Sequence, residues 1–267
     1  MPLSSLAARY DHILFDLDGC VWVGDEPTEG AADAISALRT AGKGVAFVTN
    51  DTQLSTEEYV RKLWRLGFKA SVEEVVTVGG ALQYVLAERF GGGSAVVIGS
   101  DAVHGHVEAA GLRIVNATAF ASRADVVVVA FHRGFDYAEL REATQAVLRG
   151  AYLLGSNRDA TFPMPDGLWP GSGSILAAVE TATGCRGVIV GKPEPVLVRT
   201  ALDRLGPGRA LMVGDRVDAD LAAAHAAGID GAIVLTGASD RTRAEAAVEP
   251  RPVAIAERLA TLVLQGA

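Results

Sequence analysis

Short apolar runs that stop abruptly at polar or glycine-containing loops recur along the chain, and they limit its fold more than any other feature. The first run, His12-Ile-Leu-Phe-Asp16, ends in Leu17-Asp18-Gly19, which is typical of a buried strand that stops at a loop. Helical patterns lie between the runs, one from Gly30 to Ala41 and one that begins at a capping box, Ser55-Thr-Glu-Glu58. Strands that alternate with helices predict a parallel sheet.

The runs fall into two groups, which predicts two α/β units. The remaining runs near the two ends of the chain are Val45-Ala-Phe-Val48, Val188-Ile-Val190, Leu211-Met-Val213 and Ala232-Ile-Val-Leu235. The runs in the middle, which follow the interruption Gly91-Gly-Gly-Ser94, are Ala95-Val-Val-Ile98, Asp125-Val-Val-Val-Val129 and Tyr152-Leu-Leu154. We therefore predict an α/β fold with a Rossmann-like parallel-sheet core built from residues 1–79 and 184–267. An inserted α/β cap occupies residues 80–183, since insertions succeed at surface loops whose ends lie close together.

The composition excludes several classes of protein. A chain of 267 residues with 49% hydrophobic positions can bury a sizeable core. The net charge of -8 and the lack of a basic run argue against nucleic acid as a partner. No apolar stretch approaches the roughly 20 residues of a membrane helix, and the start of the chain lacks a signal-peptide pattern, so no membrane partner is expected. Two cysteines, Cys20 and Cys185, fit a reducing compartment, and we expect a cytoplasmic protein.

Polar side chains that follow the predicted core strands should converge on one crevice, because ligands of open parallel sheets bind beyond the carboxyl ends of the strands. These residues are Asp16, Asp18, Thr49, Asn50, Lys192, Asp215 and Asp220. Several carboxylates held close together repel one another unless a hard divalent cation lies between them, and oxygen ligands suit Mg²⁺. A hydroxyl, an amide and an ammonium group supply donors for a phosphoryl group. A carboxylate beside Mg²⁺ can act as a nucleophile, and a second one two residues on can move protons.

Four segments in this order resemble the motifs of the haloacid dehalogenase-like hydrolases. They are Asp16-Leu-Asp18-Gly19, Val48-Thr49-Asn50, Gly191-Lys192-Pro193 and Gly214-Asp215-Arg-Val-Asp-Ala-Asp220. The large insert between the second and third motifs resembles the C2 cap of the NagD and 4-nitrophenylphosphatase branch. The resemblance extends to Asn157-Arg-Asp159 and Pro170-Gly-Ser-Gly173, and so covers nearly the whole chain.

The resemblance implies a Mg²⁺-dependent phosphatase that acts on a phosphomonoester of a small metabolite through an aspartyl-phosphate. Asp16 would attack phosphorus, while Asp18 would protonate the leaving oxygen and then activate water. The carboxylate of Asp16, the main-chain carbonyl of Asp18 and Asp215 would hold the metal. This division suits a reaction that depends on in-line positioning and on neutralising the phosphoryl oxygens.

The same resemblance assigns the phosphate-binding groups. Thr49 and Lys192 would bind the phosphoryl oxygens, helped by main-chain N–H groups near Asn50 and Asp51, and Asp220 would orient Lys192 or metal-bound water. Asp51 departs from the usual pattern, in which a small or amide residue follows the asparagine. An anionic side chain repels phosphate, which argues against the Asp51 carboxylate as a ligand but leaves its backbone N–H as a donor.

The cap should carry specificity, because it is inserted between motifs that share one crevice. Residues that could reach the leaving part of the substrate are His132, Arg133, Asn157 and Asp159. Substrates of this branch include glycerol 3-phosphate, phosphoglycolate, sugar phosphates, nucleotides and pyridoxal phosphate. A small metabolite such as glycerol 3-phosphate is our expectation by resemblance, and a homodimer formed through the cap is another expectation.

Two other functions are compatible with some of these residues. A phosphotransferase or phosphomutase would use the same scaffold with an acceptor better placed than water. A non-enzymatic phospho-acceptor of the receiver type also combines acidic residues, Thr and Lys on a parallel sheet, but its domain is about half this size.

Some residues that could suggest a site have simpler interpretations. Asp218 suits a helix start or a partner of the site better than a direct metal ligand. His104 and His106 have no third metal ligand nearby in the sequence, and Trp22 and Trp64 are interpreted as packing residues.

Overall fold

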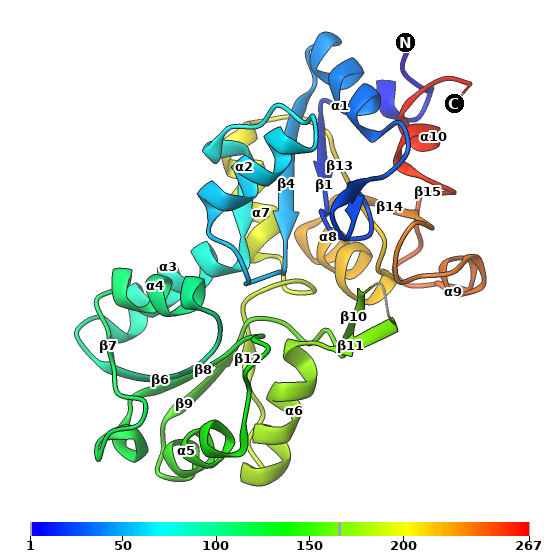
Figure 1. Ribbon diagram of the computed structural model, residues 1–267. Helices are drawn as coiled ribbons and strands as arrows, with labels where there is room; N and C mark the ends of the chain where they lie inside the picture. Colours follow the sequence, from blue (N-terminus) through cyan, green and yellow to red (C-terminus); the bar gives the residue numbers. More distant parts are fainter. Residues whose placement is uncertain (1, 165–166, 267) are drawn as a thin grey trace.

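The larger of two α/β units is built on a six-stranded parallel sheet (Figure 1). The computed structural model describes residues 2–164 and 167–266. The strands of the large sheet are β1 (His12–Phe15), β4 (Gly44–Thr49), β5 (Val75–Thr77), β13 (Ala210–Gly214), β14 (Asp230–Val234) and β15 (Ala254–Ala256). They lie in the order β15-β14-β13-β1-β4-β5, and each neighbouring pair is parallel. The α/β fold with a parallel-strand core is therefore confirmed.

Helices cover both faces of this sheet. They are α1 (Ala31–Thr40), α2 (Thr56–Arg65), α7 (Val196–Leu205), α8 (Ala222–Ala227), α9 (Arg241–Ala246) and α10 (Leu259–Val263). Shorter helical segments are η1 (Ala7–Arg9), η2 (Val72–Glu74) and the π-helical η4 (Val217–Leu221). None of the described helices is both long and apolar enough to cross a bilayer.

The smaller unit holds a second parallel sheet of five strands. Its strands are β6 (Ser94–Ile98), β7 (Arg113–Ile114), β8 (Val126–Val129), β9 (Tyr152–Gly155) and β12 (Val188–Ile189), in the order β12-β9-β8-β6-β7. Its helical segments are α3 (Val78–Phe90), α4 (Asp101–Ala109), η3 (Ala121–Arg123), α5 (Tyr137–Leu148) and α6 (Ser172–Thr183). Among the described residues, two antiparallel strand pairs complete the list of elements, β2 (Trp22–Val23) with β3 (Glu26–Pro27) and β10 (Thr161–Met164) with β11 (Gly167–Pro170).

The structure moves both predicted boundaries of the insert. Residues 188–189 were expected in the core, but Val188 pairs with Leu154 and Ile189 with Gly155, so β12 belongs to the smaller sheet. At the other boundary, residue 80 lies inside α3, which begins at Val78 directly after β5. An apolar run has the same sequence pattern in either sheet, so the pattern could not show which sheet β12 would join.

The central strand β1 is buried along its whole length, and this fixes the residue that follows it. Ile13 and Phe15 face the cluster that includes Leu259 of α10, whereas Leu14 faces the cluster that includes Leu197 of α7. Burial of each such side chain contributes about 1.5–3 kcal/mol to the free energy of unfolding. Asp16 is therefore held at the carboxyl end of a fully buried strand.

The predicted capping box opens α2 as expected. The Ser55 hydroxyl accepts a hydrogen bond from the Glu58 backbone N–H at 3.3 Å, and the Glu58 carboxylate accepts one from the Ser55 N–H at 2.8 Å. These bonds satisfy two N–H groups that an uncapped helix would leave without partners. They also fix the far end of the loop that follows β4.

A partly buried carboxylate connects α6 to the segment that precedes β12. Glu180 accepts hydrogen bonds from both terminal nitrogens of Arg158, at 3.1 and 2.9 Å, and from the Gly187 N–H at 2.8 Å. Burial alone would raise the pKa of Glu180, but these donors outweigh it and hold the pKa below its ordinary range. A lowered pKa means that the ionised carboxylate stabilises the folded state.

We expect Glu180→Gln to lower the free energy of unfolding by about 1–2 kcal/mol at pH 7, because the charge-assisted bonds from Arg158 are lost. The contribution of Glu180 is present above the pKa of the unfolded state and is lost as the pH falls through the lower folded pKa. The difference between wild type and variant should therefore shrink at pH 4, as measured by urea unfolding. Glu245→Gln, which alters an exposed ion pair with Arg241, should change stability by less than about 0.5 kcal/mol. An equal loss for Glu180→Gln at both pH values would contradict the explanation.

Candidate active site

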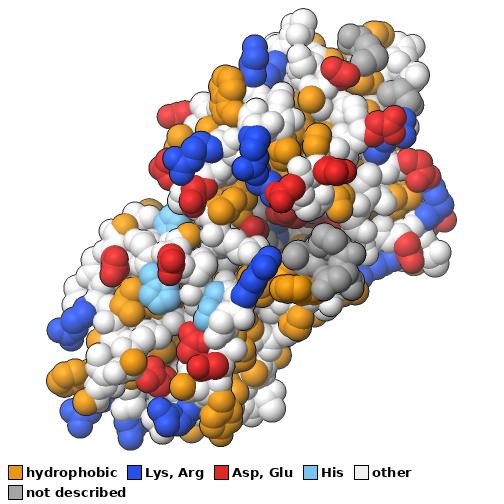
Figure 2. Space-filling model, viewed as in Figure 1, with side chains coloured by type: hydrophobic (Ala, Val, Ile, Leu, Met, Phe, Trp, Pro, Cys, Tyr) orange, Lys and Arg blue, Asp and Glu red, His pale blue; other side chains and the backbone are white. Residues whose placement is uncertain are grey.

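A pocket of about 410 Å³ lies where the two units meet, at the carboxyl ends of the core strands. Figure 2 shows the recess between the units with acidic and basic side chains around it. Asp16 and Asp215, which follow β1 and β13, lie on the core side of this pocket together with Thr49 at the end of β4. Residues of the smaller unit, including Phe131 and Asn157, line the opposite side. The predicted crevice is therefore present.

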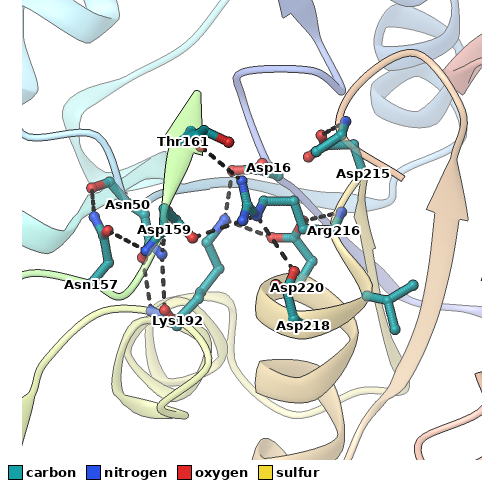
Figure 3. A network of polar contacts seen from close by, with 12 residues as sticks. Asp16, Asn50, Asn157, Asp159, Thr161, Lys192, Asp215, Arg216, Asp218 and Asp220 are labelled. Carbon is teal, nitrogen blue, oxygen red and sulfur yellow. Dashed lines mark hydrogen bonds and ion pairs between the residues drawn. The ribbon is translucent and has the colours of Figure 1, made fainter. Parts of the chain in front are cut away.

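Lys192 connects two carboxylates at the bottom of the site (Figure 3). Its Nζ donates hydrogen bonds to Oδ1 of Asp16 at 2.6 Å and to Oδ1 of Asp220 at 2.7 Å, and a third to the Val48 carbonyl at 3.1 Å. The lysine side chain is only 2% exposed. Burial alone would lower the pKa of Lys192, but the charges of Asp16 and Asp220 outweigh it and raise the pKa, so the ammonium group stays charged.

The carboxylate of Asp215 lies in a cradle that only glycines allow. A Cβ atom at Gly19 or Gly237 would come within 2.5 or 2.0 Å of Asp215 Oδ2. Gly19 also has a φ of +85°, a conformation that L side chains rarely adopt. The Ala238 N–H donates to Oδ2 at 2.5 Å, whereas the buried Oδ1 has no hydrogen-bond partner among the described residues. That buried acceptor is what a metal ligand needs.

Three carboxylates come together closely enough to hold one cation. Ligand atoms of Asp16, Asp215 and Asp220 all lie within 4.8 Å of one another, and this is the one such group within residues 2–164 and 167–266. Burial, and next the charge of Asp220, raise the pKa of Asp215 to about 7 and that of Asp16 well above its usual range. A divalent cation between them would relieve this repulsion, and oxygen ligands suit Mg²⁺.

Asp220 differs from the other two because both of its oxygens already accept hydrogen bonds. Oδ1 accepts from Lys192, and Oδ2 accepts from the Arg216 backbone N–H at 3.0 Å. Asp16 and Asp215 are left as the carboxylates that fit a cation. The position of Asp220 agrees with the predicted role of orienting Lys192.

The loop after β4 brings Thr49, Asn50 and Asp51 to the pocket. The Asp51 side chain accepts hydrogen bonds from the Tyr59 hydroxyl at 2.5 Å and from the Gln53 N–H at 3.1 Å. These donors restrain the Asp51 carboxylate. However, the Asp51 N–H donates to the Thr49 hydroxyl at 3.0 Å, so in this structure it is already engaged.

Asp18 lies on the wall of the pocket, two residues beyond Asp16. Its side chain is exposed to the pocket, yet the protein that surrounds it desolvates the carboxylate. This desolvation, followed by the charge of Asp51, raises the pKa of Asp18 to about 6, against the lowering effect of a hydrogen bond from Trp22. A carboxyl group with such a pKa can both give and take a proton near neutral pH.

Asn157 and Asp159 line the pocket but bind mainly to the core (Figure 3). Asn157 Nδ2 donates to the Asn50 carbonyl at 2.9 Å, and Asn50 Nδ2 donates to Asp159 Oδ2 at 3.3 Å. Asp159 also forms a 3.5 Å ion pair with Arg216. These contacts connect the two units around the predicted phosphate loop.

The structure separates the other two predicted specificity residues. Arg133 lines the pocket, with its guanidinium carbon 5.0 Å from the centre of the Trp169 ring. His132 is not among the described residues that line the pocket and instead forms a 3.0 Å contact with Glu139. Neighbouring residues point to different sides here, so the sequence could not distinguish them.

Sequence reasoning missed three residues of this site. Arg216 follows Asp215 within the fourth motif, and its guanidinium reaches the smaller unit, where Nη1 donates to the Thr161 carbonyl at 3.3 Å. Lys62 of α2 lines the pocket, and Tyr59 holds Asp51. The position of Arg216 inside a motif was a signal, whereas nothing in the sequence marks Tyr59 or Lys62.

Comparisons with known proteins agree with this geometry. The family model described as haloacid dehalogenase-like hydrolase matches residues 13–113, and a model described as HAD-hydrolase-like matches residues 189–262. Chronophin of Homo sapiens is 34% identical over 259 residues, which cover 91% of this chain and 87% of chronophin. The chain belongs to the haloacid dehalogenase-like hydrolases. The resemblance seen in the four motifs is thus confirmed.

A curated relative and a solved structure from one organism are also similar to this chain. The D-glycerol 3-phosphate phosphatase of Mycobacterium tuberculosis is 39% identical over 236 residues, which cover 88% of this chain and 65% of that protein. The crystal structure of a glycerol phosphate phosphatase from the same organism in complex with magnesium has a TM-score of 0.88 and 38% identity, and covers 98% of this chain and 79% of that one. Solved 4-nitrophenylphosphatases share the fold as well, in agreement with the branch that the motifs indicate.

We expect Mg²⁺ to stabilise the metal-free protein, because a cation bound to Asp16 and Asp215 is absent from the unfolded state. At a hundredfold excess over the dissociation constant, the gain would be about 2.7 kcal/mol. Thermal unfolding with increasing Mg²⁺ measures it. Asp215→Asn should abolish the gain, whereas Asp218→Asn, which changes a half-exposed carboxylate outside the cluster, should retain it. A gain that survives in Asp215→Asn would place the cation elsewhere.

Proposed function

We propose that this haloacid dehalogenase-like hydrolase is a Mg²⁺-dependent phosphatase that hydrolyses phosphomonoesters of small metabolites through an aspartyl-phosphate on Asp16. One observation carries the proposal: Asp16 faces the pocket at the end of β1, with the buried ammonium of Lys192 at 2.6 Å and Asp215 beside it. The nucleophile, a fixed positive charge and a cation site therefore lie next to one another, as phosphoryl transfer requires.

In the first step, an oxygen of Asp16 forms a bond to phosphorus while the bond from phosphorus to the leaving oxygen breaks. Protonated Asp18 gives its proton to that oxygen, so the leaving group departs as a neutral alcohol. Lys192 and the Thr49 hydroxyl face the phosphoryl oxygens and balance their charge. The Asp16 and Asp215 carboxylates and the Asp18 carbonyl would hold a divalent cation, which would supply further positive charge beside the phosphoryl oxygens.

In the second step, water attacks phosphorus and the bond from phosphorus to Asp16 breaks, which releases phosphate and restores the carboxylate. Asp18, now ionised, takes a proton from the attacking water. Asp220 keeps the Lys192 ammonium in place throughout, because its Oδ1 accepts from Nζ at 2.7 Å.

The pocket supports a small substrate. Its volume of about 410 Å³ lies near the lower end of ordinary ligand sites. The named activities of relatives, D-glycerol 3-phosphate phosphatase among them, support glycerol 3-phosphate or a compound of similar size. Assembly as a homodimer through the cap and a location in the cytoplasm stay predictions.

A screen of phosphorylated metabolites for released phosphate tests the function. We expect activity with Mg²⁺, loss with EDTA and recovery when Mg²⁺ is added back, because the cation site is part of the reacting centre. Asp16→Asn should retain less than about a hundredth of the activity, since an amide is a poor nucleophile. Activity in metal-free buffer, or a fully active Asp16→Asn, would refute the mechanism.

Asp18→Asn should affect substrates unequally, because it removes the proton donor and leaves the nucleophile. We expect kcat/KM to fall by about 10²–10⁴-fold for an alkyl phosphate. For 4-nitrophenyl phosphate the fall should be much smaller, since nitrophenolate leaves without a proton. Equal losses would argue against an acid role.

Arg133→Ala tests whether the cap recognises the leaving part of the substrate. For the best metabolite, we expect kcat/KM to fall by a factor that corresponds to about 1–3 kcal/mol of transition-state stabilisation. For 4-nitrophenyl phosphate, kcat/KM should change little. His132→Ala is the matched control and should leave both values near wild type, because His132 contacts Glu139 rather than the pocket. Parallel losses on both substrates would indicate a role in cap folding.

A further inference from the structure

Trp22 makes a contact with Asp18 that packing alone does not require. Its side chain is fully buried, and its indole Nε1–H donates a hydrogen bond to Oδ1 of Asp18 at 2.7 Å. The backbone between them folds back, because the Gly19 N–H donates to the Trp22 carbonyl at 2.7 Å and the Trp22 N–H donates to the Leu17 carbonyl at 3.2 Å. The first motif and the β2–β3 hairpin thus close on each other.

The indole is held in place from the side of α2. Lys62 Nζ lies 4.6 Å from the centre of the Trp22 ring, a distance at which a cation is attracted to the face of an indole. The same ammonium donates to the Gly24 carbonyl at 3.1 Å, within the turn of the hairpin. The ring therefore has few ways to turn its N–H away from Asp18.

This contact makes the two oxygens of Asp18 different. Oδ1 already accepts a hydrogen bond from the indole N–H, and that N–H can donate a hydrogen bond but cannot accept one. The hydroxyl oxygen of a carboxylic acid is a weaker acceptor than its carbonyl oxygen, so the acid form keeps the indole bond best with its proton on Oδ2. No described residue donates a hydrogen bond to Oδ2, and Asp18 lies on the pocket wall.

We propose that Trp22 is a positioning residue for Asp18: its N–H fixes Oδ1, so that Oδ2 faces the pocket and is the oxygen that gives and takes the proton. The proposal rests on the proposed function, because it assigns an orientation to the acid of that reaction. If Trp22 only packs, its loss would affect all substrates alike.

The test compares Trp22→Phe, which keeps an aromatic ring and removes the N–H, with a matched change elsewhere. Trp64 donates its indole N–H to the Ala70 carbonyl, also at 2.7 Å, but lies outside the pocket, so Trp64→Phe is the control. With Mg²⁺ present, we expect Trp22→Phe to lower kcat/KM for an alkyl phosphate about tenfold or more and to affect 4-nitrophenyl phosphate much less. Trp64→Phe should leave both values unchanged. In an Asp18→Asn background, Trp22→Phe should add no further loss on the alkyl phosphate.

A second measurement does not depend on activity. The indole N–H resonance of Trp22, recorded by NMR on protein labelled with ¹⁵N at tryptophan and assigned by its absence from Trp22→Phe, should shift in Asp18→Asn. The Trp64 resonance should not move. If Trp22→Phe does not fold, the Trp22 resonance is assigned as the one retained in both Trp64→Phe and Trp169→Phe, since the chain has three tryptophans.

Several outcomes would overturn the proposal. Trp22 would be only a packing residue if Trp22→Phe lowered kcat/KM equally for the two substrates or added a further loss in the Asp18→Asn background. The same conclusion would follow if the Trp22 indole resonance did not shift in Asp18→Asn. A wild-type protein that hydrolyses no phosphomonoester but shows the indole shift would refute the proposed function, and the positioning role with it, while the hydrogen bond itself would stand.

Discussion

The buried ammonium of Lys192 is the charge on which the arrangement of the site depends. It lies between Asp16 and Asp220, at 2.6 and 2.7 Å, in a place almost closed to water. Removal of one partner from a buried ion pair costs about 3–5 kcal/mol, because the other charge is left uncompensated. The three residues come from the end of β1, from η4 and from the segment after β12. The ion pairs can therefore form only when the large sheet, η4 and the connection from the smaller sheet are all in place.

That connection also explains why the two units meet at the phosphate loop. The Lys192 N–H donates to Asn50 Oδ1 at 2.8 Å, and Asn50 Nδ2 donates back to the Lys192 carbonyl at 2.9 Å. Asn157, at the end of β9, adds its bond to the Asn50 carbonyl. Asn50 thus joins the loop after β4 to two segments of the chain, through its side chain to Lys192 after β12 and through its carbonyl to Asn157 after β9. A shift of the smaller unit would be transmitted to Lys192 through these bonds.

The core side of the site could be predicted from the sequence, because the direction of the strands alone determines which residues lie there. Asp16, Thr49 and Asp215 follow parallel strands, and parallel strands end at the same edge. The same reasoning could not assign β12 to its sheet, because Val188-Ile-Val190 is as apolar as the core strands. Nor could it find Tyr59 or Lys62. These residues lie at the site only because of the direction that α2 takes after the loop. Contacts between side chains distant in sequence depend on packing, and no local pattern encodes that.

The pocket therefore has two sides with different constraints. On the core side, glycine cradles and buried ion pairs fix each carboxylate, so a substitution there would disturb several groups together. The opposite side is formed by Phe131, Arg133 and the β10–β11 hairpin, where Phe162 packs edge-on against Phe131 with ring centres 4.8 Å apart. Few polar groups depend on these side chains, apart from the contacts of Asp159 and Thr161 with Arg216. Because of this division, the aromatic and cationic side chains opposite the core can determine which phosphomonoester fits. The residues on the core side can carry out the same reaction on each of them.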